Sequence, residues 1–197
     1  MFAILANVIY RQHYINNMFF KCTIKDVNSA KKFDPASPGC IMLYFTYPGV
    51  IALRRHRTAH WLWKKGLKTL PRFISYRTRR KTGVDIHPGA TIGKGVFIDH
   101  GMGVVIGETA VIGDNCVLYH GVTLGANTFE KVDRHPKIGN NVIMYAHATI
   151  IGPIHIGDNS IVAANAVVVK DAPANSKLIG VPAHKFQKQN DLSSSFR

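Results

Sequence analysis

The sequence predicts a mainly β protein: a solenoid of short strands preceded by a small α-helical region. Two observations predict it. An apolar residue recurs at every sixth position in the second half, and the charge changes abruptly between the halves. Residues 1–84 carry 16 Lys or Arg against two acids, whereas residues 85–197 carry nine of each sign. We therefore expect a basic α-helical region over 1–84, a β domain over 85–186 and a flexible tail over 187–197.

The basic region carries helix signals. We expect one or two short helices within residues 1–33. The stretch from Asp34 to Gly39 predicts a turn and the start of a helix, because Asp suits the N-cap and Pro the first helical position. Apolar and basic residues at three- and four-residue steps then predict helix over 40–70, and a further basic helix is expected to reach Arg80.

A period of six residues dominates the second half. It fits neither the 3.6-residue period of a helix nor the two-residue period of a strand. It does fit a short strand followed by a corner, repeated about three times in each solenoid coil of about 18 residues. The repeating positions are Ile86, Ile92, Ile98, Val104, Ala110, Cys116 and Val122, and then, in a new frame, Ile138, Met144, Ile150, Ile156, Val162 and Val168.

The break between the two frames predicts a loop. Residues 128–137 leave the coil and carry charged and imidazole side chains, including Arg134 and His135. A polar loop that stands out from a rigid scaffold is a typical place for ligand contacts. We therefore expect this loop to protrude from the solenoid and to contribute to the functional site.

Composition excludes several classes of protein. Three cysteines are too few and too scattered for a disulfide framework or a Cys-based zinc site, so a reducing cytoplasm is the expected compartment. The apolar opening of ten residues is too short to span a bilayer and lacks a basic leader, so we expect no membrane protein. Hydrophobic residues make up 46% of the chain, which is enough for a packed core.

Several strings resemble a known family. The hexads and the loop are similar to those of the left-handed parallel β-helix acyltransferases, and over residues 34–186 the chain resembles the serine O-acetyltransferases among them. This resemblance implies a left-handed parallel β-helix that moves acetyl from acetyl-CoA to the hydroxyl of L-serine, for cysteine synthesis. It also implies a homotrimer, or a dimer of trimers, with active sites between neighbouring β-helices. The matching strings are Val84–Gly93, Ile98–Ala110, Gly121–Gly125, Asp133–Gly139 and Gly180–Ala183.

The chemistry of this reaction needs a base. A serine hydroxyl is a poor nucleophile at neutral pH, so a His is the usual group to remove its proton, and a carboxylate steadies that His. By resemblance, His100 is the general base and Asp85 its partner. Less than a full coil separates them along the sequence, and spacing alone does not establish that they touch.

Serine is a zwitterion, and the resemblance supplies groups for both of its charges. Arg134 and His135 match the residues that bind the carboxylate, which suits an Arg fork. Asp34 and Asp99 match the residues that bind the amino group, although capping a helix is a second role open to Asp34. Glu108 is expected to support the coil near the site.

Small residues are expected to bind the co-substrate. By resemblance, Gly125, Ala126, Ala146 and Ala164 line the groove for the pantetheine arm of acetyl-CoA. The chain departs from the family pattern in this groove. Its Ala126, Tyr145, His147 and Asn165 stand where the family has smaller or more flexible residues, which puts the strength of acetyl-CoA binding in doubt.

Other interpretations remain open. A sugar or polysaccharide O-acetyltransferase is the nearest, although it does not need Asp34, Asp99 and Arg134 to hold a zwitterion. A zinc enzyme of the same fold needs three His, and the spacing here does not match that family, so no metal is expected. A pseudoenzyme with a degraded cofactor groove is a further alternative.

The basic run from Arg72 to Lys81 fits a solvated helix face or attraction of anionic CoA better than nucleic acid or lipid, so neither is an expected partner. The family's complex with cysteine synthase uses a C-terminal Ile. This chain ends in Arg197, so that complex is not expected.

Overall fold

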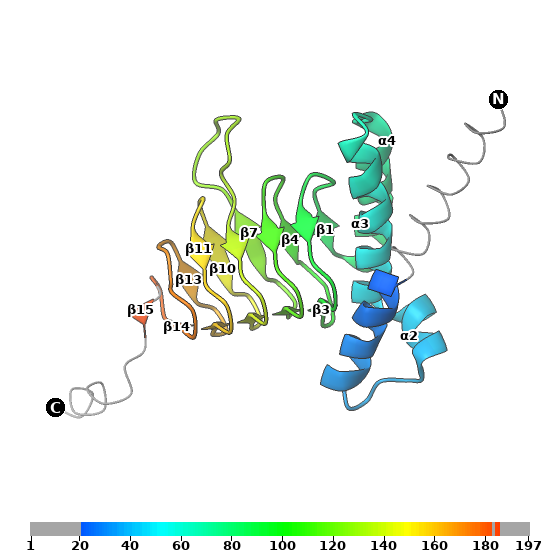
Figure 1. Cartoon of the computed structure of the whole chain (residues 1–197), viewed down its shortest axis with the longest axis horizontal. Coiled ribbons are helices and arrows are strands. Elements are labelled where there is room, and N and C mark those ends of the chain that lie inside the picture. Colours follow the sequence, from blue (N-terminus) through cyan, green and yellow to red (C-terminus); the bar gives the residue numbers. More distant parts are fainter. Residues whose placement is uncertain (1–20, 183, 186–197) are drawn as a thin grey trace, which may run out of the picture.

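The computed structural model describes residues 21–182 and 184–185. The one or two helices expected within residues 1–33 lie partly outside the described residues, and the tail expected over 187–197 lies wholly outside them. Figure 1 shows a solenoid of stacked coils with a group of helices packed against its first coil. Residues 21–33 are helical, and α2 (Cys40–Thr46), α3 (Pro48–Lys64) and α4 (Thr69–Thr82) follow.

The turn predicted at Asp34 is present, but no helix starts there, so the helix-start part of that prediction is wrong. The backbone N–H of Asp34 donates to Ala30 O, which closes the preceding helix, and its carboxylate accepts the N–H of Ala36 within a turn. The Asp side chain therefore stabilises a turn and not a helix start. The next helix, α2, begins at Cys40 after Gly39, and the Pro at a first helical position is Pro48, in α3.

Helix α4 delivers the chain into the solenoid. It ends at Gly83, which has φ +74° and whose N–H donates to Arg79 O. This left-handed conformation is readily available to glycine and ends many helices. The first strand begins two residues later, so the last turn of α4 lies beside the first coil.

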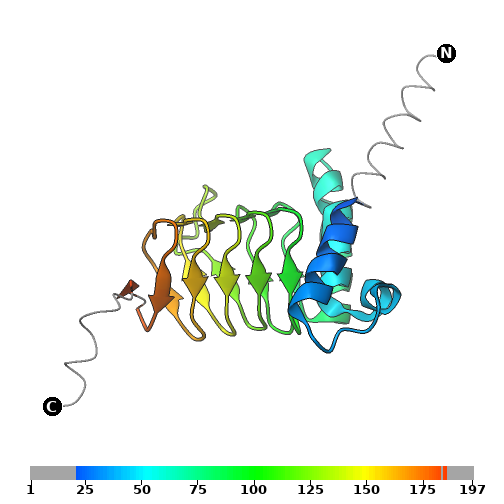
Figure 2. The same ribbon diagram turned by 60° about the horizontal axis from the view of Figure 1, so that its bottom comes forward.

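Three parallel sheets form the sides of a left-handed β-helix, as expected. The strands of successive coils lie in rows along the solenoid (Figure 2). The last strand of sheet C pairs antiparallel to its neighbour. Sheet A contains β1 (Asp85–Ile86), β4 (Val105–Ile106), β7 (Thr123–Gly125), β10 (Thr149–Ile151) and β13 (Val167–Val168). Sheet B contains β2 (Thr91–Ile92), β5 (Val111–Ile112), β8 (Lys137–Ile138) and β11 (His155–Ile156). Sheet C contains β3 (Phe97–Ile98), β6 (Val117–Leu118), β9 (Ile143–Met144), β12 (Ile161–Val162), β14 (Lys177–Ile179) and β15 (His184–Lys185).

The single frame predicted from Ile86 to Val122 is wrong. Asp85 pairs with Val105, and Val105 pairs with Thr123, so the first coil is longer than the second by two residues. The extra residues lie in the corner after β3, and the inward strand position moves from Ile98 to Ile106. The prediction failed because the residue two before each inward position is also buried: Val104, Ala110, Cys116 and Val122 are at most 1% exposed. The six-residue apolar period therefore continues through the insertion.

The predicted loop does stand out from the coils (Figure 1). Thr123 pairs with Thr149, and Thr149 pairs with Val167, so the coil that contains the loop is longer than the next by eight residues. Lys137, expected to end the loop, is already the first residue of β8. The strands on both sides of the loop remain paired, so the insertion does not disturb the stacking of the coils.

Aliphatic side chains fill the centre of the solenoid. Cys116 belongs to this core, fully buried, with its Sγ 3.1 Å from Gly139 O. Burial raises the pKa of the Cys116 thiol to about 11, so the group stays protonated and is not a nucleophile. Within residues 21–182 and 184–185, none of the helices is long and apolar enough to cross a membrane.

The helices are fixed to the solenoid by polar and close contacts. Arg57 Nη2 donates to Asp26 Oδ2 at 2.5 Å and to Gly93 O, and both side chains of this ion pair are buried. His56 Nε2 and His60 Nδ1 lie 3.1 and 2.9 Å from the carbonyls of Ala90 and Pro88. Because these contacts join α3 to the first coil, the helical region holds a fixed position beside the start of the solenoid.

Candidate active site

His100 lies at the corner between sheets C and A, in the two-residue insertion of the first coil. Its φ is +58°, the left-handed conformation that Asn115, Asn141, His147, Asn159, Asn165 and Asn175 also adopt, so it belongs to the repeated turn geometry of the solenoid. The turn is tightened by the N–H of Gly101, which donates to Asp99 O at 2.6 Å. The imidazole is 73% exposed, and its Nε2 is 3.7 Å from Asp99 Oδ2. The corner therefore presents a solvent-accessible base beside one carboxylate.

Asp34, predicted to bind the amino group, meets Asp99 at this corner. Tyr47, between α2 and α3, has its hydroxyl 2.9 Å from Asp34 Oδ2 and 2.9 Å from Asp99 Oδ1. The structure thus brings together Asp34, Asp99 and His100, with Tyr47 added to them. We call these four residues the corner cluster. It contains two carboxylates that face one phenol, next to the exposed imidazole.

Asp85 lies elsewhere, in a cleft of about 730 Å³ on the face of sheet A. Helix α4, strands β1 and β4 and the protruding loop line this sheet A cleft, and His100 is not among its lining residues. Asp85 Oδ2 is 3.1 Å from Arg79 Nη1. Among the described residues, no hydrogen bond or ion pair links Asp85 to His100. Within one chain, the predicted catalytic pair is therefore not formed.

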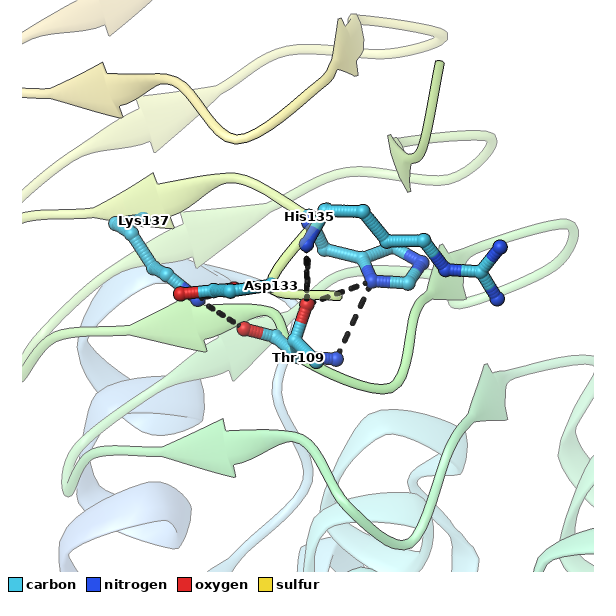
Figure 3. Close-up of polar contacts among 5 residues, drawn as sticks. Thr109, Asp133, His135 and Lys137 are labelled. Carbon is cyan, nitrogen blue, oxygen red and sulfur yellow. Dashed lines mark hydrogen bonds and ion pairs between the residues drawn. The ribbon is translucent and has the colours of Figure 1, made fainter. Parts of the chain in front are cut away.

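Arg134 and His135, from the end of the loop, line the same cleft. Figure 3 shows His135 beside Thr109. The hydroxyl of Thr109 accepts the backbone N–H groups of both residues at 3.1 Å. His135 lies over Gly107, where an added Cβ would be 1.9 Å from the imidazole Cδ2. Arg134 Nη1 donates to Thr128 O at 2.9 Å, across the base of the loop. The end of the loop is therefore held in place by one threonine hydroxyl and a glycine.

The contacts of His135 fix which ring nitrogen carries its hydrogen. The backbone N–H of Thr109 points at Nδ1 from 3.3 Å, and the Thr109 hydroxyl is 2.9 Å from the same nitrogen. Because an amide N–H can only donate, Nδ1 is an acceptor and the neutral ring carries its hydrogen on Nε2. Burial lowers the pKa of His135, and the neighbouring Arg134 lowers it further. His135 is thus a neutral donor at neutral pH, which suits the binding of a carboxylate.

Other charges around the cleft hold the loop. Lys137 Nζ donates to Asp133 Oδ1 at 2.6 Å and to Thr109 O. That hydrogen bond from Lys137 lowers the pKa of Asp133, so its carboxylate stays ionised. His87 also lines the cleft; burial lowers its pKa, although Glu108 opposes the effect.

The four residues predicted to bind the pantetheine arm lie at two corners. Ala146 and Ala164 follow sheet C strands in adjacent coils, and the N–H of Asn165 donates to Ala146 O at 3.0 Å. Gly125 and Ala126 lie at the far end of sheet A, because β7 ends at Gly125 whereas Ala146 precedes the neighbouring strand β10. An added Cβ at Gly125 would be 2.8 Å from Ile151 Cδ1. One chain therefore presents two small-residue corners and not one continuous groove.

Comparisons with known proteins identify the family. Models described as bacterial transferase hexapeptide (six repeats) and hexapeptide repeat of succinyl-transferase match residues 135–170 and 102–128. Serine acetyltransferase of Mycobacterium tuberculosis is 52% identical over 157 residues, which are 80% of this chain and 69% of that protein. The chain belongs to the serine acetyltransferases. The Synechococcus elongatus enzyme is 46% identical over 83% of this chain and 67% of its own length.

Solved serine acetyltransferases have the same fold. The Neisseria gonorrhoeae enzyme in complex with serine matches with a TM-score of 0.85 and 41% identity, over 91% of this chain and 73% of that chain. The Brucella abortus enzyme in complex with coenzyme A matches with a TM-score of 0.85 and 38% identity, over 93% and 74%. The helical region is included in this similarity, since the solenoid alone makes up little more than half of the chain.

Tyr145 and His147, two of the residues that depart from the family pattern, lie along the row of corners that contains His100. The rings of His100 and His120 are 5.9 Å apart, those of His120 and His147 are 4.9 Å apart, and both contacts are edge to face. The rings of Tyr145 and Tyr119 are stacked 5.3 Å apart. The three imidazoles follow the corner one after another and do not converge on one point. Within the described part of the chain, no group of three His, Cys, Asp or Glu is placed to hold a metal ion.

Sequence reasoning missed four residues of the candidate site. Tyr47 and Thr109 are uncharged and carried no spacing signal, so neither pointed to the site. Arg79 belongs to the basic run that was interpreted mainly as a solvated helix face, yet it pairs with Asp85, and Arg72 of the same run lines the cleft. The sequence did contain a signal for Arg79: α4 continues through Gly83 directly into β1, which places the last turn of α4 beside Asp85.

Replacing Thr109 with valine is expected to raise KM for L-serine about tenfold. The change keeps the shape but leaves two backbone N–H groups without their acceptor, at a cost of about 1–3 kcal/mol each when they are buried. Arg134 and His135 then lose their fixed position. Steady-state kinetics with both substrates measures the effect, and Thr91→Val, at an exposed threonine of β2, is the control. An unchanged KM for serine would contradict the anchoring role.

Proposed function

We propose that this protein is a serine O-acetyltransferase, which transfers acetyl from acetyl-CoA to the hydroxyl of L-serine and forms O-acetyl-L-serine for cysteine biosynthesis. The observation that carries the proposal is the set of groups for a zwitterion. Asp34 and Asp99 both contact the Tyr47 hydroxyl at the corner, and Arg134 and neutral His135 line the sheet A cleft. Carboxylates suit an ammonium, and an Arg fork with a His donor suits a carboxylate.

His100 is the base in this proposal. Its imidazole removes the hydroxyl proton of serine as the serine oxygen attacks the thioester carbon. The C–O bond of the product forms, the C–S bond breaks, and His100 returns the proton to the sulfur of the leaving CoA. Acetyl-CoA supplies the activated acetyl group, and the small corner residues Ala146 and Ala164 fit a narrow pantetheine arm beside the coil.

We propose that the complete site forms between two copies of the chain. The corner cluster holds the base and the ammonium ligands, whereas the sheet A cleft holds Asp85, Arg134 and His135. Each cluster lacks what the other supplies. A head-to-tail contact that places the corner cluster of one copy against the cleft of its neighbour closes into a ring, and a homotrimer is the arrangement we expect. A dimer of trimers would need a further contact through the helices.

A cytoplasmic location is the compartment we propose. Cys22, Cys40 and Cys116 are all free in the described part of the chain, as expected in a reducing environment.

The acceptor is tested by offering L-serine and a panel of sugars separately with acetyl-CoA and following the release of free thiol. We expect thiol release with L-serine and none above the hydrolytic background with sugars. Release with a sugar and not with serine would overturn the proposal and favour the polysaccharide O-acetyltransferase alternative. A neutral sugar carries no ammonium group, so that alternative gives Asp34 and Asp99 no charged group to bind.

A further inference from the structure

Tyr47 joins the helical region to the solenoid at the point where the two acids meet. It lies between α2 and α3, and its N–H donates to Leu43 O. Pro48 then begins α3, and Gly49 packs against the end of β3, where an added Cβ would be 2.1 Å from Ile98 O. Only glycine allows the backbone of α3 to come this close to β3. The Tyr-Pro-Gly sequence therefore brings the Tyr47 side chain up to Asp99, the residue after β3.

Aromatic packing fixes the direction of the Tyr47 ring. It is stacked on Phe97 at 6.0 Å between ring centroids, and Phe97 is stacked in turn on Phe33, also at 6.0 Å. Phe97 is buried, and Phe33 directly precedes Asp34. The same aromatic group thus orients Tyr47 and positions the backbone of Asp34. The three rings align the phenol with both carboxylates.

The hydrogen-bond arrangement at Tyr47 is short of one donor. A phenol has one hydrogen, so it donates to one carboxylate at a time. Asp34 Oδ2 and Asp99 Oδ1 are both 2.9 Å from the Tyr47 oxygen, so when both carboxylates are ionised one of them receives no hydrogen from the phenol. A primary ammonium carries three N–H donors and a positive charge, and it would satisfy both carboxylates.

We propose that Tyr47 is a positioning residue that sets the spacing of Asp34 and Asp99, so that together they bind the primary ammonium group of the acceptor. The proposal rests on the proposed function and adds a determinant of its acceptor class, small alcohols with a free amino group. Burial, followed by the hydrogen bonds to Asp34 and Asp99, raises the pKa of the Tyr47 phenol far above its usual value. The phenol therefore keeps its hydrogen at neutral pH and remains a donor.

Tyr47→Phe in the full chain tests this role, because it keeps the ring and removes the hydroxyl. We expect KM for L-serine to rise about tenfold, as for the loss of a hydrogen bond to a charged group. KM for acetyl-CoA and kcat should stay within about twofold, since neither depends on binding the ammonium. Tyr44→Phe is the matched control, because Tyr44 lies in the neighbouring helix with its ring under Arg54 and not against the acids.

Acceptor analogues separate positioning from a general structural role. Ethanolamine has the ammonium without the carboxylate, and 3-hydroxypropanoate has the carboxylate without the ammonium. Both are tested as competitive inhibitors against L-serine. We expect Tyr47→Phe to weaken inhibition by ethanolamine about tenfold and to leave that by 3-hydroxypropanoate unchanged. A purely structural effect would instead weaken both equally or reduce only the fraction of active enzyme.

An unchanged KM for serine, or equal weakening of both analogues, would overturn the role of Tyr47. If the wild type acetylates sugars and not serine, the proposed function itself is wrong. If the wild type acetylates serine and Tyr47→Phe has an unchanged KM for serine, only the role of Tyr47 is wrong. Tyr47→Leu is the second variant if the apolar edge of a phenylalanine against two carboxylates prevents folding, since its smaller side chain leaves room for water between the acids. The same rise in KM for serine is expected, and its absence counts against the proposal equally.

Discussion

Replacing His100 with alanine is expected to lower kcat for acetyl transfer to L-serine by about 10²-fold or more, the usual contribution of a general base. The imidazole is 73% exposed at its corner and makes an edge contact with the ring of His120, so its loss should leave the fold intact. Steady-state thiol release at saturating concentrations of both substrates measures the effect.

His155→Ala is the control for the loss of an imidazole from the solenoid. His155 is exposed in β11 of sheet B, where its backbone N–H and not its ring binds Asp171. This variant should retain the wild-type kcat. A His100→Ala enzyme that turns over at the wild-type rate would remove the proposed mechanism.

Mixing two inactive variants is expected to restore activity if the site forms between copies. His100→Ala removes the base from the corner cluster, and Arg134→Ala removes the carboxylate ligand from the sheet A cleft. Each variant alone should be nearly inactive. When the two are co-expressed in equal amounts, about a quarter of the sites in a head-to-tail ring combine an intact corner with an intact cleft. Activity near a quarter of the wild-type rate per chain is therefore expected.

A pair of variants in the same cluster provides the control. His100→Ala mixed with Asp99→Ala damages the corner of every chain, so no arrangement of copies contains an intact site. Activity should then stay at the level of the single variants. Failure of the first pair to recover activity, in an assembly shown to contain both chains, would mean that the corner and the cleft of one chain act together.

The periodicity of the sequence was sufficient to predict the solenoid, but not its exact frame. Ile98 and Ile106 occupy equivalent inward positions eight residues apart, and Val104 conceals the change because corner residues are also buried. A pattern of apolar residues alone cannot separate these two buried positions. The strand pairing of Asp85 with Val105 was needed to distinguish them.

The site was predictable to the extent that its groups are ionisable. Asp34, Asp99 and His100 were expected from matching strings, and the structure brings them together although Asp34 belongs to the helical region and Asp99 to the solenoid. The roles assigned to these residues remain predictions. Tyr47 gave no signal because its contribution depends on a close approach of α3 to β3, which is a tertiary contact. The separation of Asp85 from His100 also required knowledge of which strand lies on which sheet.

The protruding loop leaves and re-enters the coil without altering the register of the strands around it: Thr123 still pairs with Thr149, and Val111 with Lys137. Changes in the length and composition of the loop are therefore expected to leave the strand pairing and the stability of the solenoid largely unaffected. Exchange of this short surface element is therefore expected to alter acceptor preference, while the coils that carry the base keep their pairing.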